Sequence, residues 1–309
     1  MYNLNNMIKR YTNNNLVWID AENPDKSEIE GLMSEFDLEP EVAQELTLPT
    51  YKPKIKVYDD YIYMVLHFPA FRHNSEDHEH EIDFVIGKNF LITTRYGNID
   101  QLEKITKVFE VNNLLAKHDL SDNTGYLFYY IIKELFKSLN DEIDYINDTL
   151  RGIENKIFAG QEKQMVTSLS RVSRNLLEFK NVVTGENETI LTLERSGHAV
   201  FEKKLSYNLS DIVSEYYKIE RAIERNINFL SELRETNNSL LSTKQNEIMK
   251  TLTIITFTVM PFSIINSFFQ INTTFKPLSG IPYDWYILVG IETLVVLLLY
   301  TLARRNKWF

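Results

Sequence analysis

Hydrophobic and polar positions along the first hundred residues alternate in short runs, which predicts a small mixed domain of strands and helices. The runs are rich in β-branched and aromatic residues, and Asn, Asp, Gly and Pro separate them. The predicted strands cover residues 16–20, 54–58, 61–68, 79–86 and 90–94, and amphipathic helices are predicted at 25–36 and 39–46. The last four strands form two hairpins, and Gly97 ends the sheet region.

Beyond residue 97 the spacing of apolar residues becomes helical, and two heptad seams predict long packed helices. The first seam consists of Leu139, Ile143, Ile146, Leu150, Ile153 and Ile157. The second consists of Ile212, Tyr216, Ile219, Ile223, Asn226, Leu230, Leu233, Asn237 and Leu240. A further helix is predicted at 162–183, with boundaries at Gly160, Gly185 and Gly197. No proline or glycine interrupts residues 199–260, which predicts one helix of about 60 residues or more.

Residues 251–271 and 285–303 are almost uniformly apolar, and each is long enough to cross a membrane of about 30 Å. Between residues 251 and 303 the charged residues are Lys276, Asp284 and Glu292. The pattern predicts a membrane hairpin that carries a soluble body. The alternative is a pair of buried core helices, but nothing else in the chain could cover two such uniformly apolar helices.

Basic residues flank the outer ends of the two spans, which predicts that both termini are cytoplasmic. They are Lys244, Lys250, Arg304, Arg305 and Lys307, whereas the connecting loop has only Lys276. Trp285, Tyr286 and Trp308 lie near the ends of the second span, as interfacial aromatic residues do. Residues 1–15 lack the apolar region of a signal peptide. The two spans predict a multi-pass protein of the cell membrane.

The net charge is −10, and because residues 251–309 carry +2, the remainder carries −12. This charge argues against a nucleic-acid partner and suits the attraction of cations, although an acidic soluble protein would have it as well. The absence of cysteine excludes disulfides and thiolate metal sites. The sequence has no phosphate-binding loop and no nucleophile–base pair, so we expect neither an enzyme nor ATP-driven transport.

The first span has a stripe of residues at helical spacing that could line a pore. This "pore stripe" consists of Asn246, Met249, Leu252, Thr256, Met260, Ser263 and Ser267. In a symmetric ring, its amide and hydroxyl oxygens could hold a hydrated cation, and its apolar rungs could gate by dewetting. The alternative is that small polar residues simply pack helix against helix. Pro261 removes one backbone hydrogen bond and is expected to bend the span.

Several motifs are distributed along the chain. They are Asn246-Glu-Ile-Met-Lys-Thr-Leu-Thr-Ile-Ile, Met260-Pro261, Ile271-Asn272, the end Lys307-Trp308-Phe309, and upstream Trp18-Ile19-Asp20 and Lys52-Pro53-Lys54. Together these motifs resemble the CorA family of magnesium/cobalt channels. The resemblance covers essentially the whole chain. It implies a homopentamer that lies in the lipid bilayer and has a funnel-shaped cytoplasmic domain. It also implies passive entry of hydrated Mg²⁺.

The expected fold is therefore an α+β cytoplasmic domain, then a very long α-helix, then a two-helix transmembrane hairpin. We assign residues 1–97 to the α/β domain and 98–198 to a cytoplasmic helical region. The stalk helix and first span take 199–271, the external loop 272–283, the second span 284–303, and a basic cytoplasmic tail 304–309.

At the mouth, Gln270-Ile271-Asn272 stands where the family has Gly-Met-Asn. The resemblance implies that the side-chain oxygen of Asn272 meets the hydrated ion first. Gln270 lacks the backbone freedom of glycine and adds a side chain near the entrance. Asn272 and Gln270 therefore join the pore stripe as candidate selectivity residues.

The resemblance also implies regulatory Mg²⁺ between subunits, with Glu45 and Asp211 at one site and Glu235 at a second. Mg²⁺ takes oxygen ligands and keeps several waters, so one carboxylate from each subunit can suffice. The alternative for each residue is a solvated acid. Mg²⁺ is thus expected both as the transported ion and as a regulator, with no organic cofactor.

Two further groups of ionisable residues are candidates for function. Glu292 lies within the second span, where a carboxylate is by default functional; we favour a protonated or hydrogen-bonded group over a role in transport. His73, His78 and His80 form a cluster with nearby acids that could take Zn²⁺, Ni²⁺ or Co²⁺, but a solvated hairpin loop is favoured.

The resulting functional hypothesis is a membrane channel or transporter for divalent cations, with Mg²⁺ foremost and Co²⁺ and Ni²⁺ as further substrates. One alternative is a zinc transporter on the same scaffold. The other is a non-conducting metal sensor that kept the scaffold and changed the mouth.

Overall fold

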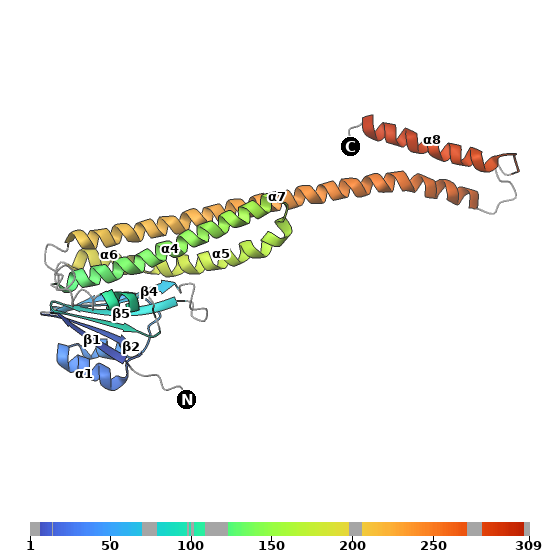
Figure 1. The fold of residues 1–309 in the computed structure, drawn as a ribbon. Coiled ribbons are helices and arrows are strands. Elements are labelled where there is room, and N and C mark those ends of the chain that lie inside the picture. The colour runs from blue at the N-terminus through green and yellow to red at the C-terminus, as the bar shows by residue number, and fades with distance from the viewer. Residues whose placement is uncertain are drawn as a thin grey trace. The chain divides into compact units, whose positions relative to one another are not determined.

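The computed structural model describes residues 7–13, 15–69, 79–97, 99, 102–108, 123–197, 206–270 and 280–305. Within it the chain divides into two compact units, Met1–Arg234 and Glu235–Phe309. The α+β fold, the very long helix and the C-terminal helix pair are as the sequence predicts (Figure 1).

A six-stranded sheet forms the centre of the first unit. Its strands are β1 Met7–Asn13, β2 Leu16–Glu22, β3 Lys54–Val57, β4 Tyr61–Pro69, β5 Glu79–Gly87 and β6 Phe90–Arg95, in the order β1-β2-β6-β5-β4-β3. The β2–β6 pair is parallel and the other pairs are antiparallel. Both predicted hairpins are confirmed. Strand β1 does not follow from the sequence pattern, because its residues are mostly polar.

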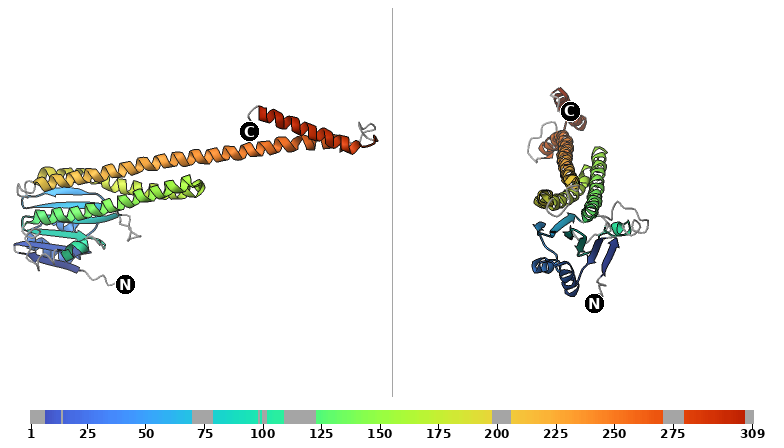
Figure 2. Two further views of the ribbon diagram at one scale, coloured as in Figure 1. Left: turned by 45° about the horizontal axis from the view of Figure 1, so that its top comes forward. Right: turned by 90° about the vertical axis from the view of Figure 1, so that its left-hand side faces the viewer.

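Alternation along the strands sends side chains to two cores, one on each face of the sheet. On one face Ile19, Tyr63 and Val85 pack with the short helices α1 Lys26–Phe36 and α2 Pro40–Glu45. On the other face Phe84 meets Phe128 of helix α4 (Thr124–Phe158), edge to face, with ring centroids 5.4 Å apart. Figure 2 shows the sheet between these two helical layers.

Helix α1 begins where its sequence provides a complete N-terminal cap. The Asp25 side chain accepts a hydrogen bond from the Glu28 backbone N–H at 2.8 Å, and the Glu28 side chain accepts one from the Asp25 N–H at 2.8 Å. This capping box satisfies two amides that the helix itself cannot. The helix ends at Asp37, which adopts a left-handed conformation with φ 51°.

Three helices cover the second face of the sheet: α4 Thr124–Phe158, α5 Glu162–Gly185 and α6 Asn187–Ser196. All six residues of the first heptad seam are buried. Gly160, at φ 87°, provides the turn from α4 into α5, a conformation that favours glycine. The predicted interruptions at Gly160, Gly185 and Gly197 coincide with the ends of these helices.

Helix α7, Ser206–Gln270, runs without interruption for 65 residues, as the absence of proline and glycine before Pro261 predicts. In the first unit its seam packs on the other helices: the Tyr216 hydroxyl donates to the Val183 carbonyl at 2.9 Å, and Asn226 Nδ2 donates to the Ile143 carbonyl at 3.4 Å. Residues 199–205, where the same helix is expected to begin, lie outside the described residues.

The second unit contains the end of α7 and helix α8, Asp284–Arg305. Both helices are long and apolar enough to cross a membrane, and in this single chain their apolar windows are not buried. Large apolar side chains such as Phe257, Leu297 and Leu302 are about half exposed (51%, 58% and 46%). Such surfaces require lipid or neighbouring helices to cover them.

Candidate functional site

The pore stripe lies on α7, and all of its side chains are exposed in the single chain, as is that of Gln270. Two of its hydroxyls are already committed as donors. Thr256 Oγ1 donates to the Leu252 carbonyl at 2.9 Å, and Ser267 Oγ donates to the Ser263 carbonyl at 2.7 Å. Because each hydroxyl proton is used within the helix, the oxygen lone pairs remain available to accept hydrogen bonds from water.

The opposite side of α7 is partly buried in the single chain. Within the membrane segment of α7 the half-buried side chains are Ile254, Pro261, Phe262 and Ile265. At about 100° per residue, their mean direction lies roughly 180° from that of the pore stripe. Burial therefore distinguishes two opposite surfaces of α7, one half-buried within the chain and one exposed.

At the mouth, Gln270 is the last residue of α7 and is exposed. Ile271 and Asn272 lie outside the described residues, so the arrangement of the mouth stays a prediction.

Glu45, the first predicted regulatory carboxylate, is the last residue of α2 and is held by two lysines of β3. Lys54 Nζ lies 2.7 Å from Oε2 and Lys56 Nζ lies 3.5 Å from Oε1. Burial alone would raise the pKa of Glu45, but the hydrogen bond from Lys54 and the charges of both lysines lower it below its usual value. Glu45 is therefore ionised and forms ion pairs with Lys54 and Lys56.

Asp211, the second predicted regulatory carboxylate, is half-buried in the first turns of α7. Its Oδ2 accepts a hydrogen bond from the Tyr129 hydroxyl at 2.6 Å, and Lys133 Nζ donates to that hydroxyl oxygen at 3.1 Å. Burial and the bond to Asp211 raise the pKa of Tyr129. Glu235 is exposed further along α7. Within the described part of one chain, no hydrogen bond or ion pair joins Glu45 to Asp211.

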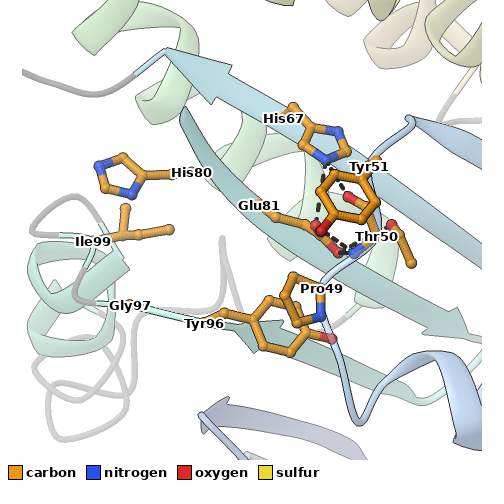
Figure 3. A pocket seen from close by; sticks show the side chains of 9 residues that line it. All are labelled: Pro49, Thr50, Tyr51, His67, His80, Glu81, Tyr96, Gly97 and Ile99. Carbon is orange, nitrogen blue, oxygen red and sulfur yellow. Dashed lines mark hydrogen bonds and ion pairs between the residues drawn. The ribbon is translucent and has the colours of Figure 1, made fainter. Parts of the chain in front are cut away.

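A pocket of about 210 Å³ opens in the soluble unit beside a buried group of charges (Figure 3). His67 on β4 is 5% exposed, and its Nε2 lies 2.8 Å from the Thr50 carbonyl and 3.3 Å from Glu81 Oε2. Its Nδ1 lies 3.7 Å from Glu186 Oε1, which is an ion-pair distance rather than a hydrogen bond. The same Glu186 oxygen accepts the His67 backbone N–H at 2.6 Å.

These contacts keep the imidazole charged. Burial alone would lower the pKa of His67, but Glu186, Glu81 and the Thr50 carbonyl raise it to about 10. Glu186 lies at the junction of α5 and α6, so the group joins the covering helices to the sheet. Sequence reasoning missed this group; the available signal was a histidine inside the otherwise apolar strand β4 and several ionisable residues in the neighbouring strand β5.

A second buried acid lies between this group and Glu45. Asp83 on β5 accepts a hydrogen bond from the Tyr96 hydroxyl at 3.2 Å, and that hydroxyl is 3.4 Å from the Glu45 carbonyl. Burial and the neighbouring charge of Glu81 raise the pKa of Asp83 well above its usual value. The sheet thus buries a chain of ionisable groups that ends beside Glu45.

Glu292 is the buried residue of α8, with 9% of its surface exposed. Its Oε1 is enclosed and has no hydrogen-bond partner among the described residues. His80 is buried on β5 and lines the pocket, but Figure 3 shows it beside Ile99, away from His67. His73 and His78 lie outside the described residues, and the described ones contain no group of three or more His, Cys, Asp or Glu that could hold a metal.

Known proteins resemble this chain over nearly its whole length. The cobalt/magnesium transport protein CorA of Thermotoga maritima is 21% identical over 293 residues, which are 94% of this chain and 83% of that protein. The complete structure of the CorA magnesium transporter from Methanocaldococcus jannaschii superposes with a TM-score of 0.82 at 19% identity, covering 97% of this chain and 93% of that one.

A narrower likeness concerns the soluble part. The ZntB cytoplasmic domain from Vibrio parahaemolyticus superposes with a TM-score of 0.61 at 14% identity, over 74% of this chain and 88% of that one. At such identities the structural likeness establishes the fold alone. The sequence profile of the CorA-like Mg²⁺ transporter protein matches residues 13–305, and because this is nearly the whole chain, the protein belongs to that family of divalent-cation membrane transporters, which are not enzymes.

Proposed function

We propose that five copies of this chain form a channel in the cell membrane, with both termini cytoplasmic, that admits hydrated Mg²⁺. Co²⁺ and Ni²⁺ are further substrates. The observation that carries the proposal is the division of α7 into two faces: half-buried residues lie on one, and the pore stripe occupies the other, exposed face. Oligomerisation about the stripe would give it a polar lumen and leave α8 toward lipid.

The chemistry of the stripe suits a hydrated cation. Mg²⁺ sheds its water reluctantly, so a conduction path needs acceptors for water protons rather than direct ligands. Thr256 and Ser267 provide such acceptors, because their own protons are bonded within the helix. Met249, Leu252 and Met260 would form apolar rings that close the path by dewetting. Neutral oxygens avoid trapping the ion, as conduction requires.

At the outer end, Asn272 would ring the mouth with amide oxygens, and Gln270 would lie just inside it. The amide oxygens accept hydrogen bonds from waters of the ion, which is the first step of selection. Gln270 either adds a further oxygen for these waters or merely replaces glycine. Gln270→Gly separates the two: weaker ion binding at the mouth supports the first role and higher flux supports the second.

Regulation would come from Mg²⁺ bound between subunits by Glu45 and Asp211, with Glu235 at a second site. Glu45 is ionised, as a magnesium ligand must be, and in one chain it has lysines as counter-ions. The family resemblance implies that an ion shared by Glu45 and Asp211 lies between copies. High internal Mg²⁺ would then favour the closed state.

The test uses single cysteines, because the natural chain has none. Ser267→Cys places a thiol on the pore stripe, and Thr258→Cys places one on the α8 side of the same helix. In liposomes, a charged thiol reagent should block Mg²⁺ flux through Ser267→Cys and leave Thr258→Cys unaffected. Equal block of both, or of neither, contradicts the assignment of the lumen.

A second candidate is zinc transport, favoured by the likeness to the ZntB cytoplasmic domain. A panel of Mg²⁺, Co²⁺, Ni²⁺ and Zn²⁺ fluxes distinguishes the two, and dependence of Zn²⁺ flux on a pH gradient identifies a proton-coupled carrier. No flux of any ion from a correctly assembled oligomer would favour a non-conducting metal sensor.

A further inference from the structure

A groove runs between α7 and α8 at the end of the hairpin where α7 enters the apolar segment. Its volume is about 640 Å³, which is within the range of about 300–1,000 Å³ typical of ligand pockets. Its walls are mainly apolar, with Ile254 and Phe257 from α7 and Val296, Leu299 and Leu302 from α8. A groove of this shape and lining accommodates a hydrocarbon chain.

The same end of the hairpin is basic. Lys250 lines the groove itself, and Arg304 and Arg305 occupy the last turn of α8 beside its final lining residue, Ala303. All three basic side chains are exposed. Among the described residues none of the three has an ion-pair partner. The groove therefore combines an apolar trough with positive charge at one end, which is complementary to an anionic lipid.

We propose that this groove binds one acyl chain of an anionic phospholipid, whose phosphate is held by Lys250 and Arg304. The inference rests on the proposed function in one respect, because a lumen lined by the pore stripe leaves the groove accessible to lipid. The Tyr300 side chain, which also lines the groove, provides an interfacial aromatic at the level of the headgroup. Lipid in this groove would fill the angle between the pore helix and the outer helix, so its occupancy would support their packing.

The test is native mass spectrometry of the intact oligomer, titrated with phosphatidylglycerol or with phosphatidylcholine of the same chains. The natural protein should bind phosphatidylglycerol more tightly. Lys250→Gln and Arg304→Gln should each weaken that binding about fivefold, as expected for one basic residue near a lipid headgroup. Lys244→Gln is the matched control. It removes the same charge about 9 Å nearer the N-terminus of α7 than Lys250, and it should have little effect.

A second variant tests the trough rather than the headgroup. Ala303→Trp fills the groove and should reduce binding of both lipids. If this bulky variant does not fold, Lys250→Gln, an exposed substitution, still tests the proposal. Unchanged affinity in Lys250→Gln overturns the headgroup assignment. Crosslinking of a photoactivatable phosphatidylglycerol should label peptides of the groove; adducts between chains at the groove would show that a second copy fills it and overturn the proposal. Because lipid binding is measured without ion flux, its failure is distinguishable from failure of the channel.

Discussion

Replacing His67 by Gln removes a buried positive charge that lies between two carboxylates. Glu81 and Glu186 would then lie inside the protein without the imidazolium between them. Breaking a buried ion pair by removing one partner typically costs about 3–5 kcal/mol, and both carboxylates here are about 7% exposed. We therefore expect the soluble unit of His67→Gln to be destabilised by roughly that amount at pH 7.

The same group predicts how stability depends on pH. The folded pKa of His67 is about 10, above its ordinary value of 6.5. A group whose pKa is raised by folding contributes stability that is complete below the ordinary pKa and is lost as the pH rises through the folded pKa. The contribution can reach about 5 kcal/mol, since one pKa unit corresponds to about 1.4 kcal/mol. The natural protein should thus lose stability between pH 7 and 10.

The assay is thermal unfolding of the full chain in detergent, followed by the fluorescence of Trp18. This residue is fully buried in β2, and its Nε1 donates to Thr93 Oγ1 at 3.1 Å. Trp285→Phe and Trp308→Phe remove the fluorescence of the other two tryptophans. The natural chain should melt at lower temperature at pH 10 than at pH 7, and His67→Gln should show a much smaller change. An equal pH dependence in both proteins would refute the assignment of that charge to His67.

Three further predictions concern the proposed channel. Asp211→Asn should weaken protection of the soluble domain from protease by Mg²⁺; unchanged protection would remove Asp211 from the regulatory site. Asn272→Ala should abolish most Mg²⁺ uptake into liposomes without changing the mass of the oligomer, and full uptake would mean that Asn272 does not face the ion. Glu292→Leu should raise the melting temperature of the hairpin in detergent, because an enclosed oxygen without a partner costs about 1–3 kcal/mol. A lower melting temperature would instead reveal a partner for Glu292 in another copy.

Elements with strong periodicity could be predicted from the sequence. The heptad seams, the capping box at Asp25 and the glycine at 160 are local signals, so the helices and their ends follow from neighbouring residues. Strand β1 could not be predicted in this way, because it is a polar edge strand whose place depends on pairing with β2. The missed charges are non-local as well, since His67 and Glu186 are separated by 119 residues. The contacts of Glu45 with Lys54 and Lys56 could not be predicted either, because they depend on how β3 lies beside α2.

In the proposed channel, one side of helix α7 faces the ion path and the opposite side packs within the chain, about half a turn away. A substitution scan of residues 246–270 should therefore give two sensitivity profiles, each with a period of about 3.6 residues. Loss of ion flux at normal expression should peak at the positions of Thr256, Ser263 and Ser267. Loss of expression should peak at those of Ile254, Phe262 and Ile265. The interval between the two sets of maxima would give the angle between the proposed lumen and the partly buried side of α7.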